Sequence, residues 1–217
     1  MTVHAILLDE LERDALTELV NIGVSRAAGN LRKMVGEHVL LSVPSVEVVT
    51  REQATVLIRE RESGELVAVR QDFVGVFSGR ALLIFPKSNS MALVHAVTGG
   101  ALSVEEAADM ENEALAETGN VVLNSCLATM ANMLQQPLTM SLPEVIRGDG
   151  STLFDASPSA AEGGVVLFLY INFAINDRDI RGYIAMLMDL PSLESLKQLI
   201  GEFIRQVMGE EEPGLAG

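Results

Sequence analysis

The stretch DALTELVNIG, residues 14–23, carries the residue pattern that decides the fold. Its apolar residues recur at intervals of three and four, which predicts an amphipathic helix. A matching stretch, EALAETGNVV, returns at residues 113–122. In both stretches an acidic residue is followed four positions later by a glutamate, and three positions after that by an asparagine. We therefore expect two long helices of the same character.

Capping boxes define where these helices begin. Asp9 with Glu12, and Ser103 with Glu106, have the spacing in which each side chain caps the other residue's backbone N–H. The first helix should end near Gly36, and the second should run to about Gln135. The predicted apolar stripe of the first helix comprises Leu11, Ala15, Leu16, Leu19, Val20, Gly23, Val24, Ala27, Ala28 and Leu31.

Between the helices the sequence turns to strand-like segments rich in Val, Ile, Leu and Phe. Gly64 is expected at a hairpin turn, residues 88–97 in a short helix, residues 148–164 in a loop, and residues 192–208 in a last helix. The predicted strands are residues 38–49, 54–60, 66–79, 80–86, 137–148, 165–175 and 181–190.

A shift of 99 positions superimposes the two halves of the chain. It aligns Asp14 with Glu113, Glu18 with Glu117, Asn21 with Asn120, and Pro44 with Pro143. This indicates an internal duplication. The expected fold is α+β: a pseudo-twofold duplicated unit in which an antiparallel β-sheet carries two long helices on one face. We predict a single domain of two repeats, about residues 9–99 and 103–208, followed by a flexible acidic tail at 209–217. Two separate domains are disfavoured because no linker divides the halves.

Composition limits the function classes. The chain has 217 residues, 48% of them hydrophobic, and a net charge of −15. So acidic a surface argues against nucleic-acid binding, which needs clustered Lys and Arg. The longest apolar segments are shorter than the ~20 residues that a membrane-spanning helix needs, no signal peptide is evident, and the one cysteine, Cys126, cannot form an internal disulfide. A cytoplasmic protein is expected, and its three scattered histidines give no metal-ligand spacing.

The polar residues of the two stretches form a narrow ridge on each helix. At ~100° per residue, the four members of each ridge fall within about 60° on the helical wheel. A solvated helix face explains one such ridge adequately, but the matched register of two favours a function. The ridges are Asp14, Glu18, Asn21 and Ser25, and Glu113, Glu117, Asn120 and Asn124.

The paired motif (Asp/Ser)-x3-Glu-x2-Asn-x22-Pro resembles that of the CheC branch of the CheC/CheX/FliY family, phosphatases of the phosphorylated chemotaxis response regulator CheY. The first copy, Asp14 to Pro44, fits the motif at every position. The second copy ends at Pro143 and fits except that Glu113 replaces the usual Asp or Ser. The resemblance covers essentially the whole chain, and CheX, which carries one central motif, fits less well.

The resemblance implies a mechanism and a set of site residues. The catalytic residues would be Glu18, Asn21, Glu117 and Asn120, supported by Asp14, Glu113, Pro44 and Pro143. The asparagine would insert into the receiver and orient the water that attacks the aspartyl phosphate, while the glutamate docks on the receiver's Lys. An amide suits this role because it donates and accepts hydrogen bonds without charge. No cofactor of the protein's own is implied; Mg²⁺ is expected in the phosphorylated receiver.

An adaptor is the alternative function. Related proteins act as non-catalytic parts of the chemotaxis or flagellar-switch system, for example as CheD-binding regulators. Possible CheD contacts are residues 88–97 and the pair Gly99-Gly100. The presence of both Glu/Asn pairs favours catalysis, and the lack of residues for an extra switch domain favours the CheC type over the FliY type.

Overall fold

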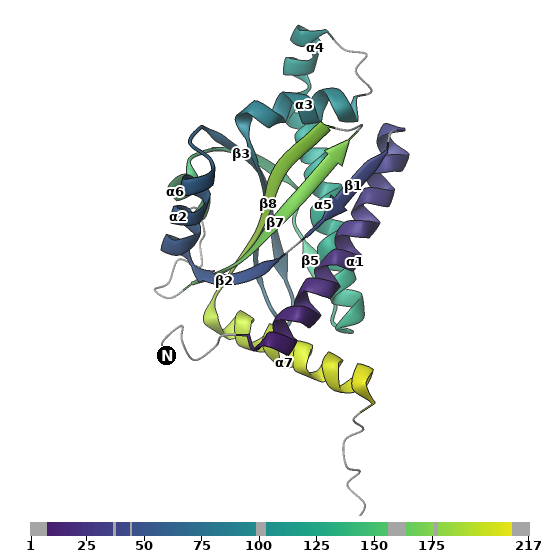
Figure 1. Ribbon diagram of the computed structural model, residues 1–217, viewed down its shortest axis with the longest axis vertical. Helices are drawn as coiled ribbons and strands as arrows, with labels where there is room; N and C mark the ends of the chain where they lie inside the picture. The colour runs from purple at the N-terminus through teal and green to yellow at the C-terminus, as the bar shows by residue number, and fades with distance from the viewer. Residues whose placement is uncertain are drawn as a thin grey trace, which may run out of the picture.

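Two long helices lie against one antiparallel sheet (Figure 1). The structure, a computed structural model, describes residues 8–36, 38–43, 45–98, 103–155, 164–175 and 178–209. The elements, in chain order, are α1 (Glu10–Val35), β1 (Val39–Ser42), β2 (Val46–Thr50), α2 (Arg51–Arg61), β3 (Leu66–Val74), β4 (Gly79–Pro86), α3 (Lys87–Val97), α4 (Val104–Asp109), α5 (Glu111–Met133), β5 (Thr139–Met140), β6 (Glu144–Gly148), α6 (Gly150–Asp155), β7 (Val165–Ile175), β8 (Arg178–Met188) and α7 (Leu190–Met208).

Helix α1 begins and ends where its sequence predicts. The carboxylate of Asp9 accepts a hydrogen bond from the Glu12 backbone N–H at 2.8 Å, and Glu12 accepts one from the Asp9 N–H at 2.8 Å. Gly36 ends the helix at φ 73°, in the left-handed region that glycine adopts without strain. The predicted apolar stripe is buried or half-buried except for Leu11, which is exposed.

The second predicted helix is divided into α4 and α5. The capping box of Ser103 and Glu106 starts α4, as expected. The chain then bends at Met110, which ends α4 and begins α5. Helix α5 stops at Met133, and Gln135 follows with a positive φ of 54°. The expected helix is therefore present, with one break and a slightly earlier end.

The sheet has eight strands and exchanges strands between the two repeats. Its order is β1-β7-β8-β4-β3-β5, with β2 also paired to β7 and β6 also paired to β3. Strands β1 and β2 of the first repeat thus pair with β7 of the second, while β5 and β6 of the second pair with β3 of the first. The β4–β8 pair joins the two halves at the centre of the sheet.

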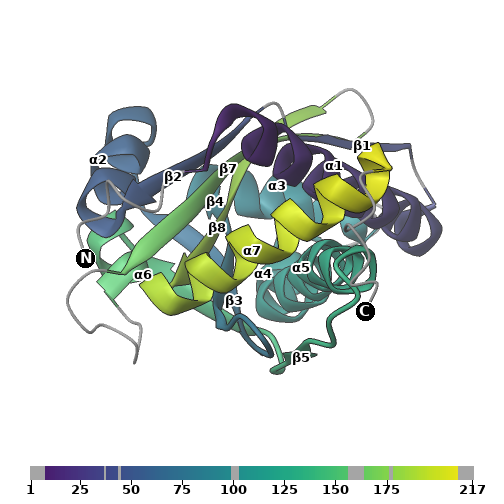
Figure 2. The ribbon, with the colours of Figure 1, turned by 90° about the horizontal axis from the view of Figure 1, so that it is seen from below.

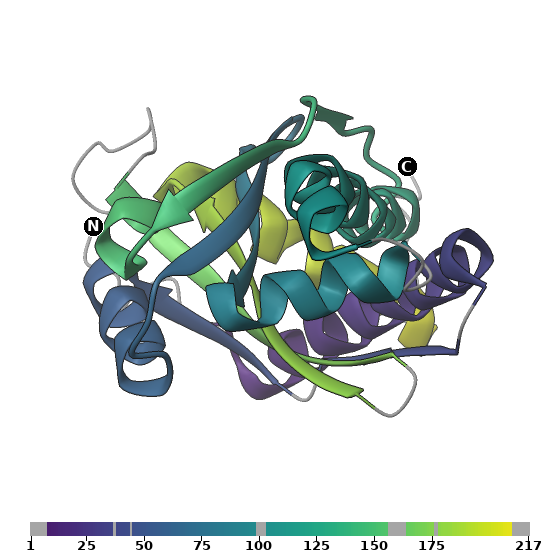
Figure 3. The same cartoon turned by 90° about the horizontal axis from the view of Figure 1, so that it is seen from above.

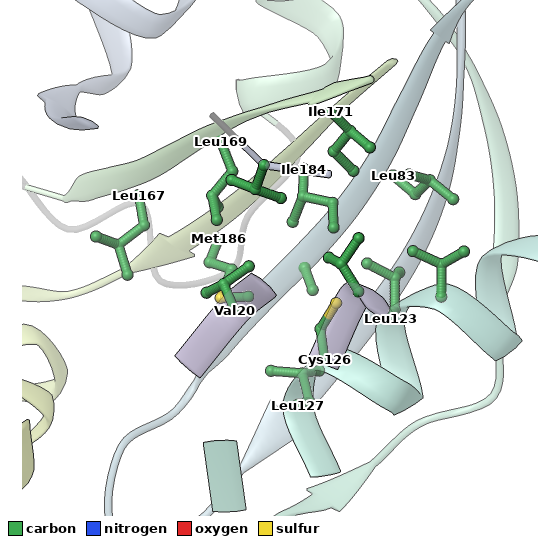
Figure 4. Packing of buried hydrophobic residues seen from close by; sticks show 14 of the residues in the cluster. Val20, Leu83, Leu123, Cys126, Leu127, Leu167, Leu169, Ile171, Ile184 and Met186 are labelled. Carbon is green, nitrogen blue, oxygen red and sulfur yellow. The ribbon is translucent and has the colours of Figure 1, made fainter. Parts of the chain in front are cut away.

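Helices cover both faces of the sheet. The long helices α1 and α5 lie on one face, and α2 and α6 lie together on the other (Figure 1). Helix α7 crosses one end of the α1–α5 pair and α3 crosses the opposite end (Figures 2 and 3). Buried residues form one apolar cluster on each face. The larger cluster packs the helices against β4, β7 and β8 through residues such as Val20, Leu123, Leu83, Leu169 and Ile184 (Figure 4).

The two long helices run antiparallel and cross closely. A Cβ built on Gly23 would lie 2.7 Å from the Cα of Cys126, so only glycine permits this approach. Arg26 donates to Thr129 Oγ1 at 3.3 Å, and Asn30 donates to Ser125 Oγ at 3.4 Å. The shift of 99 positions aligns Arg26 with Ser125 and Asn30 with Thr129, so the two contacts are equivalent. The pseudo-twofold axis therefore passes through the point where the helices cross.

Three local predictions are wrong. Residues 54–60, expected as a strand, lie in α2, which Thr50 and Gln53 begin with a capping box. Gly64 therefore follows a helix and is not in a hairpin turn. The expected loop at 148–164 contains the short helix α6, capped by Asp149, whose carboxylate accepts from the Thr152 backbone N–H at 2.9 Å. In both helices a polar cap lies one residue before the first turn.

The expected fold class is confirmed: helices and an antiparallel sheet, with the two long helices on one face. The element order α-β-β-α-β-β-α occurs twice, from α1 to α3 and from α5 to α7, as expected of a duplicated unit. The domain limits stay a prediction. Pro44, Gly99, Gly100 and the tail residues 210–217 lie outside the described residues.

Candidate functional site

The two polar ridges lie on the outer sides of α1 and α5. Glu18 and Glu117 are exposed, whereas Asn21 and Asn120, one helical turn later, are half-buried. Each asparagine comes three residues after its glutamate, so its side chain is turned further towards the loop that joins two strands of its own repeat. Each site therefore has a free carboxylate on its outer side and an amide at its base.

The carboxylates of the ridges are available to a partner. Asp14 and Glu113 are exposed, like the two glutamates. Among the described residues, none of these four carboxylates takes part in an ion pair. Asp14 also lines a shallow groove between α1 and β2, with Arg13, Thr17 and residues 45–49.

At the first site, the side-chain amide of Asn21 forms two hydrogen bonds with the backbone of Val43. Its Nδ2 donates to the Val43 carbonyl at 3.0 Å, and its Oδ1 accepts from the Val43 N–H at 2.9 Å. The two backbone groups fix which end of the amide is oxygen and which is nitrogen. Val43 is 2% exposed, so this loop is folded down against α1.

At the second site, Asn120 belongs to a side-chain network. Its Oδ1 accepts from Asn124 Nδ2 at 2.6 Å and from Gln71 Nε2 at 3.2 Å. Gln71 Nε2 also lies 3.0 Å from the carbonyl oxygen of Ser141, in the loop after β5. This network thus joins α5, β3 and the β5–β6 loop.

Helix α5 can approach β3 this closely because of Gly119. A Cβ at Gly119 would lie 2.4 Å from the Cβ of Val69 on β3, closer than any side chain allows. The glycine immediately precedes Asn120, and Val69 lies two positions before Gln71 on the same side of the strand. The close contact brings Asn120 within reach of Gln71.

The two amides therefore retain different hydrogen-bonding capacity. An amide group has two N–H donors and two acceptor lone pairs. Asn21 uses one donor and one acceptor on Val43, so one of each remains. Asn120 uses both acceptor positions of Oδ1, and among the described residues its Nδ2 donates to nothing. The first site can offer a donor and an acceptor, and the second offers two donors.

The rims of the sites also differ. Leu142, which the shift of 99 aligns with Val43, is 88% exposed. Pro143 is half-buried between β5 and β6, and its counterpart Pro44 lies outside the described residues. The second site thus has an apolar, open rim where the first has a closed loop.

Neither the cysteine nor a metal-binding cluster contributes to these sites in the described part of the chain. Burial raises the pKa of the Cys126 thiol to about 12, which leaves it a neutral core residue. In the part of the chain that the structure describes, no three His, Cys, Asp or Glu side chains cluster so as to hold a metal ion. None of its helices is long and apolar enough to cross a membrane.

Sequence reasoning missed Gln71. Its signal is present in β3, LVAVRQDFV, where Val67, Val69 and Phe73 alternate on the buried, helix-facing side and Gln71 occupies the same side. A lone glutamine at a core-facing position of a strand requires a hydrogen-bonding partner. The partner could not be identified without knowing that α5 lies over this strand.

Comparisons with known proteins find similarity to chemotaxis phosphatases. The family model described as chemotaxis phosphatase CheX matches residues 67–169. The flagellar motor switch phosphatase FliY of Bacillus subtilis (strain 168) is 26% identical over 140 residues, which are 64% of this chain and 36% of that protein. This chain thus corresponds to only part of that relative. A Halobacterium salinarum protein named "Putative CheY-P phosphatase CheC1" is 20% identical over 196 residues, 89% of this chain and 97% of that one.

Solved structures share the fold. FliY of Thermotoga maritima superimposes with a TM-score of 0.72 at 18% identity, over 91% of this chain and 99% of that one. FliM, in its complex with FliG from H. pylori, superimposes with a TM-score of 0.63 at 11% identity, over 88% of this chain and 100% of that one. At these identities the likeness is one of architecture.

Proposed function

We propose that this chain, which is similar to chemotaxis proteins of the CheC/CheX/FliY group, is a phosphatase that hydrolyses the aspartyl phosphate of a CheY-type receiver domain. The observation that carries the proposal is the repeated Glu-x2-Asn pair. Each pair presents an exposed, unpaired carboxylate one helical turn before an amide at the base of a site. Two such sites lie on helices related by a pseudo-twofold axis.

In the proposed mechanism, the glutamate docks and the asparagine positions. Glu18 or Glu117 pairs with the Lys of the receiver, which brings the amide of Asn21 or Asn120 to the phosphoryl group. The amide holds a water in line with the bond to be broken. The water oxygen bonds to phosphorus while the phosphorus–oxygen bond to the aspartyl carboxylate breaks. The carboxylate leaves with the electron pair, and the water's protons pass to phosphate and solvent.

For this reaction the phosphatase has only to dock on the receiver and to position the attacking water. The transferred group is already an activated acyl phosphate, and the receiver's Mg²⁺ stabilises the charge on its oxygens. We assign that Mg²⁺ to the receiver and not to this chain. A neutral amide fits beside the phosphoryl oxygens, whereas a carboxylate at the same place would repel them. The remaining residues, Asp14 and Glu113, extend the docking surface.

The partners and location follow from this reaction. The proposal includes a cytoplasmic location, where phosphorylated receivers of this kind are found. CheD stays an expectation from the family resemblance: of its suggested contacts, residues 88–97 lie in α3, and Gly99 and Gly100 are outside the described residues.

The test is the decay of a phosphorylated CheY-type receiver with Mg²⁺, measured with wild type, Asn21→Ala, Asn120→Ala and the double variant. We expect wild type to accelerate decay by about 100-fold or more, as positioned catalysis does. The double variant should lose this acceleration while keeping its circular dichroism spectrum. Binding of the receiver without faster decay would instead support the adaptor function.

A further inference from the structure

Gln71 is a buried polar residue with an unusual set of contacts. It is 1% exposed and lies on the side of β3 that faces α5. Its Nε2 lies within 3.0–3.4 Å of three oxygens: the Ser141 carbonyl, Asn120 Oδ1 and Asn124 Oδ1. Its own Oε1 is buried and accepts no hydrogen bond from the described residues. The side chain is therefore held through its nitrogen alone.

The backbone determines the orientation of this network. Ser141 is fixed to β3, because its N–H donates to the Asp72 carbonyl at 2.9 Å and its Oγ accepts from the Asp72 N–H at 2.9 Å. The Ser141 carbonyl can only accept, so the end of Gln71 that faces it must be the amide nitrogen. The same nitrogen also faces the oxygens of Asn120, at 3.2 Å, and Asn124, at 3.4 Å. The Asn120 Nδ2 group is thereby turned away from Gln71.

Among the described residues, the first site has no counterpart of this network. Val69 pairs with Val145, and Leu169 pairs with Val46, the residue that the shift of 99 aligns with Val145. Val69 is therefore equivalent to Leu169, and Gln71, two positions later, is equivalent to Ile171. Ile171 is 3% exposed and apolar. The shift of 99 likewise aligns Asn124 with Ser25, which is exposed. The two repeats keep the same Glu and Asn but support the Asn differently.

We propose that Gln71 is a positioning residue of the second site: it turns the amide of Asn120 so that this site meets its receiver with two N–H donors, while the first site offers one donor and one acceptor. The inference rests on the proposed function. Two donors can contact the oxygen of the attacking water and a phosphoryl oxygen together, but they cannot accept a proton from the water. The two sites are thus chemically unequal although both have the Glu-x2-Asn pair.

The burial of Gln71 supports a functional reason for keeping it. A buried amide oxygen without a partner is unfavourable, and an isoleucine fills the equivalent place at the first site without that cost. If packing were the only requirement, an apolar side chain would fit at position 71, as Ile171 does at the equivalent position. What an apolar side chain cannot supply is the N–H group that orients Asn120.

A kinetic experiment tests the role with each site isolated. In the Asn21→Ala background only the second site remains, and Gln71→Ile should lower its kcat about tenfold with little change in KM, because docking by Glu117 is unaffected. Gln71→Ile with Asn124→Ser, which gives the second site the residues of the first site, should lose at least as much. In the Asn120→Ala background the same Gln71→Ile change should cost nothing further. Equal losses in both backgrounds would overturn the proposal, since they would report general destabilisation.

A spectroscopic experiment tests the orientation without any activity. Side-chain amide signals in a ¹H–¹⁵N spectrum of the wild-type protein are assigned by comparison with Asn120→Ala and Gln71→Ile. The Gln71 Nε2 protons should be protected from solvent exchange, and the Asn120 Nδ2 protons should exchange rapidly. Protected Asn120 protons would overturn the proposal. If no receiver is dephosphorylated by either site, the proposed function fails, and this measurement still decides the role of Gln71.

Discussion

Leu142 and Val43 are equivalent in sequence but differ in exposure, 88% against 2%. An exposed leucine beside the second site is suited to contact a receiver, because burying such a side chain at an interface is favourable. We expect Leu142→Ser, in the Asn21→Ala background, to raise KM several-fold, corresponding to about 1 kcal/mol of docking energy, with kcat unchanged. Steady-state kinetics over a range of receiver concentrations measures this.

The matched variant at the first site should behave in the opposite way. Val43→Ser places a hydroxyl in the core and should lower the free energy of unfolding by about 1–3 kcal/mol. Leu142→Ser should change it by less than about 0.5 kcal/mol, since the side chain is in solvent. Urea denaturation of both variants distinguishes the two positions. Equal stability losses would show that Leu142 packs into the fold in solution.

Cys126 is expected to be unreactive in the folded protein. Burial raises its pKa from 9.0 to about 12, so folding favours the neutral thiol. This contribution to stability is complete below pH 9 and is lost as the pH rises towards 12. A thiol reagent at pH 8 should therefore label Cys126 only when urea unfolds the chain. Rapid labelling without urea would mean that the α1–α5 crossing opens.

Some of this residue-level detail could be predicted from the sequence and some could not. The shift of 99 identified Glu18, Asn21, Glu117 and Asn120, because a repeated motif is a property of the sequence. The partners of the two asparagines could not be identified in this way. Gln71 is 49 positions from Asn120 in the chain, and their contact depends on how α5 lies over β3.

At the scale of elements, the approach of α5 to β3 depends on Gly119. Gly119→Ala would force its Cβ against Val69 and move the helix outward, with an expected cost of about 1–3 kcal/mol. Because Asn120 is the next residue, activity of the second site should fall as well. Urea denaturation gives the first quantity and the single-site assay gives the second.

Gly29 provides the matched control for this substitution. It lies in α1, exposed, and a Cβ built on it meets no atom within 4 Å. Gly29→Ala should stabilise the protein by about 0.4–1 kcal/mol, since alanine loses less backbone freedom on forming a helix. A destabilising effect at Gly29 would contradict the structure of α1.

The elements most poorly predicted are the two short helices, α2 and α6. In residues 54–60 the apolar residues fit a strand, but burial of Ala54 and Ile58 with Val56 half in solvent shows a four-residue period. So short a segment does not distinguish the two periods. Strand β7 has the predicted bounds, Val165–Ile175, because it is a continuous apolar run, whereas β8 begins three residues earlier than predicted, at the polar residue Arg178, and ends two residues earlier, at Met188.

For the whole molecule, exchange of strands makes each repeat dependent on the other. Without the second repeat, β1 and β2 lack β7, and β3 lacks β5 and β6. We expect residues 1–100 expressed alone to be unfolded or to associate through the exposed strand edges. Mixing them with residues 101–217 should restore the circular dichroism and the mass of one complete unit, measured by sedimentation. A folded, monomeric half would contradict the observed pairing.

The exchanged strands also suggest how such a chain could arise. If each half completes the sheet of the other, a single ancestral copy could have filled the same role for its twin, as two separate chains related by a true twofold axis. In that ancestor every substitution would have appeared in both active sites at once. Fusion of two such genes would remove this constraint, so that a glutamine at position 71 and an isoleucine at position 171 could be inherited independently. Either half of the gene could then change while the other half kept the ancestral residues.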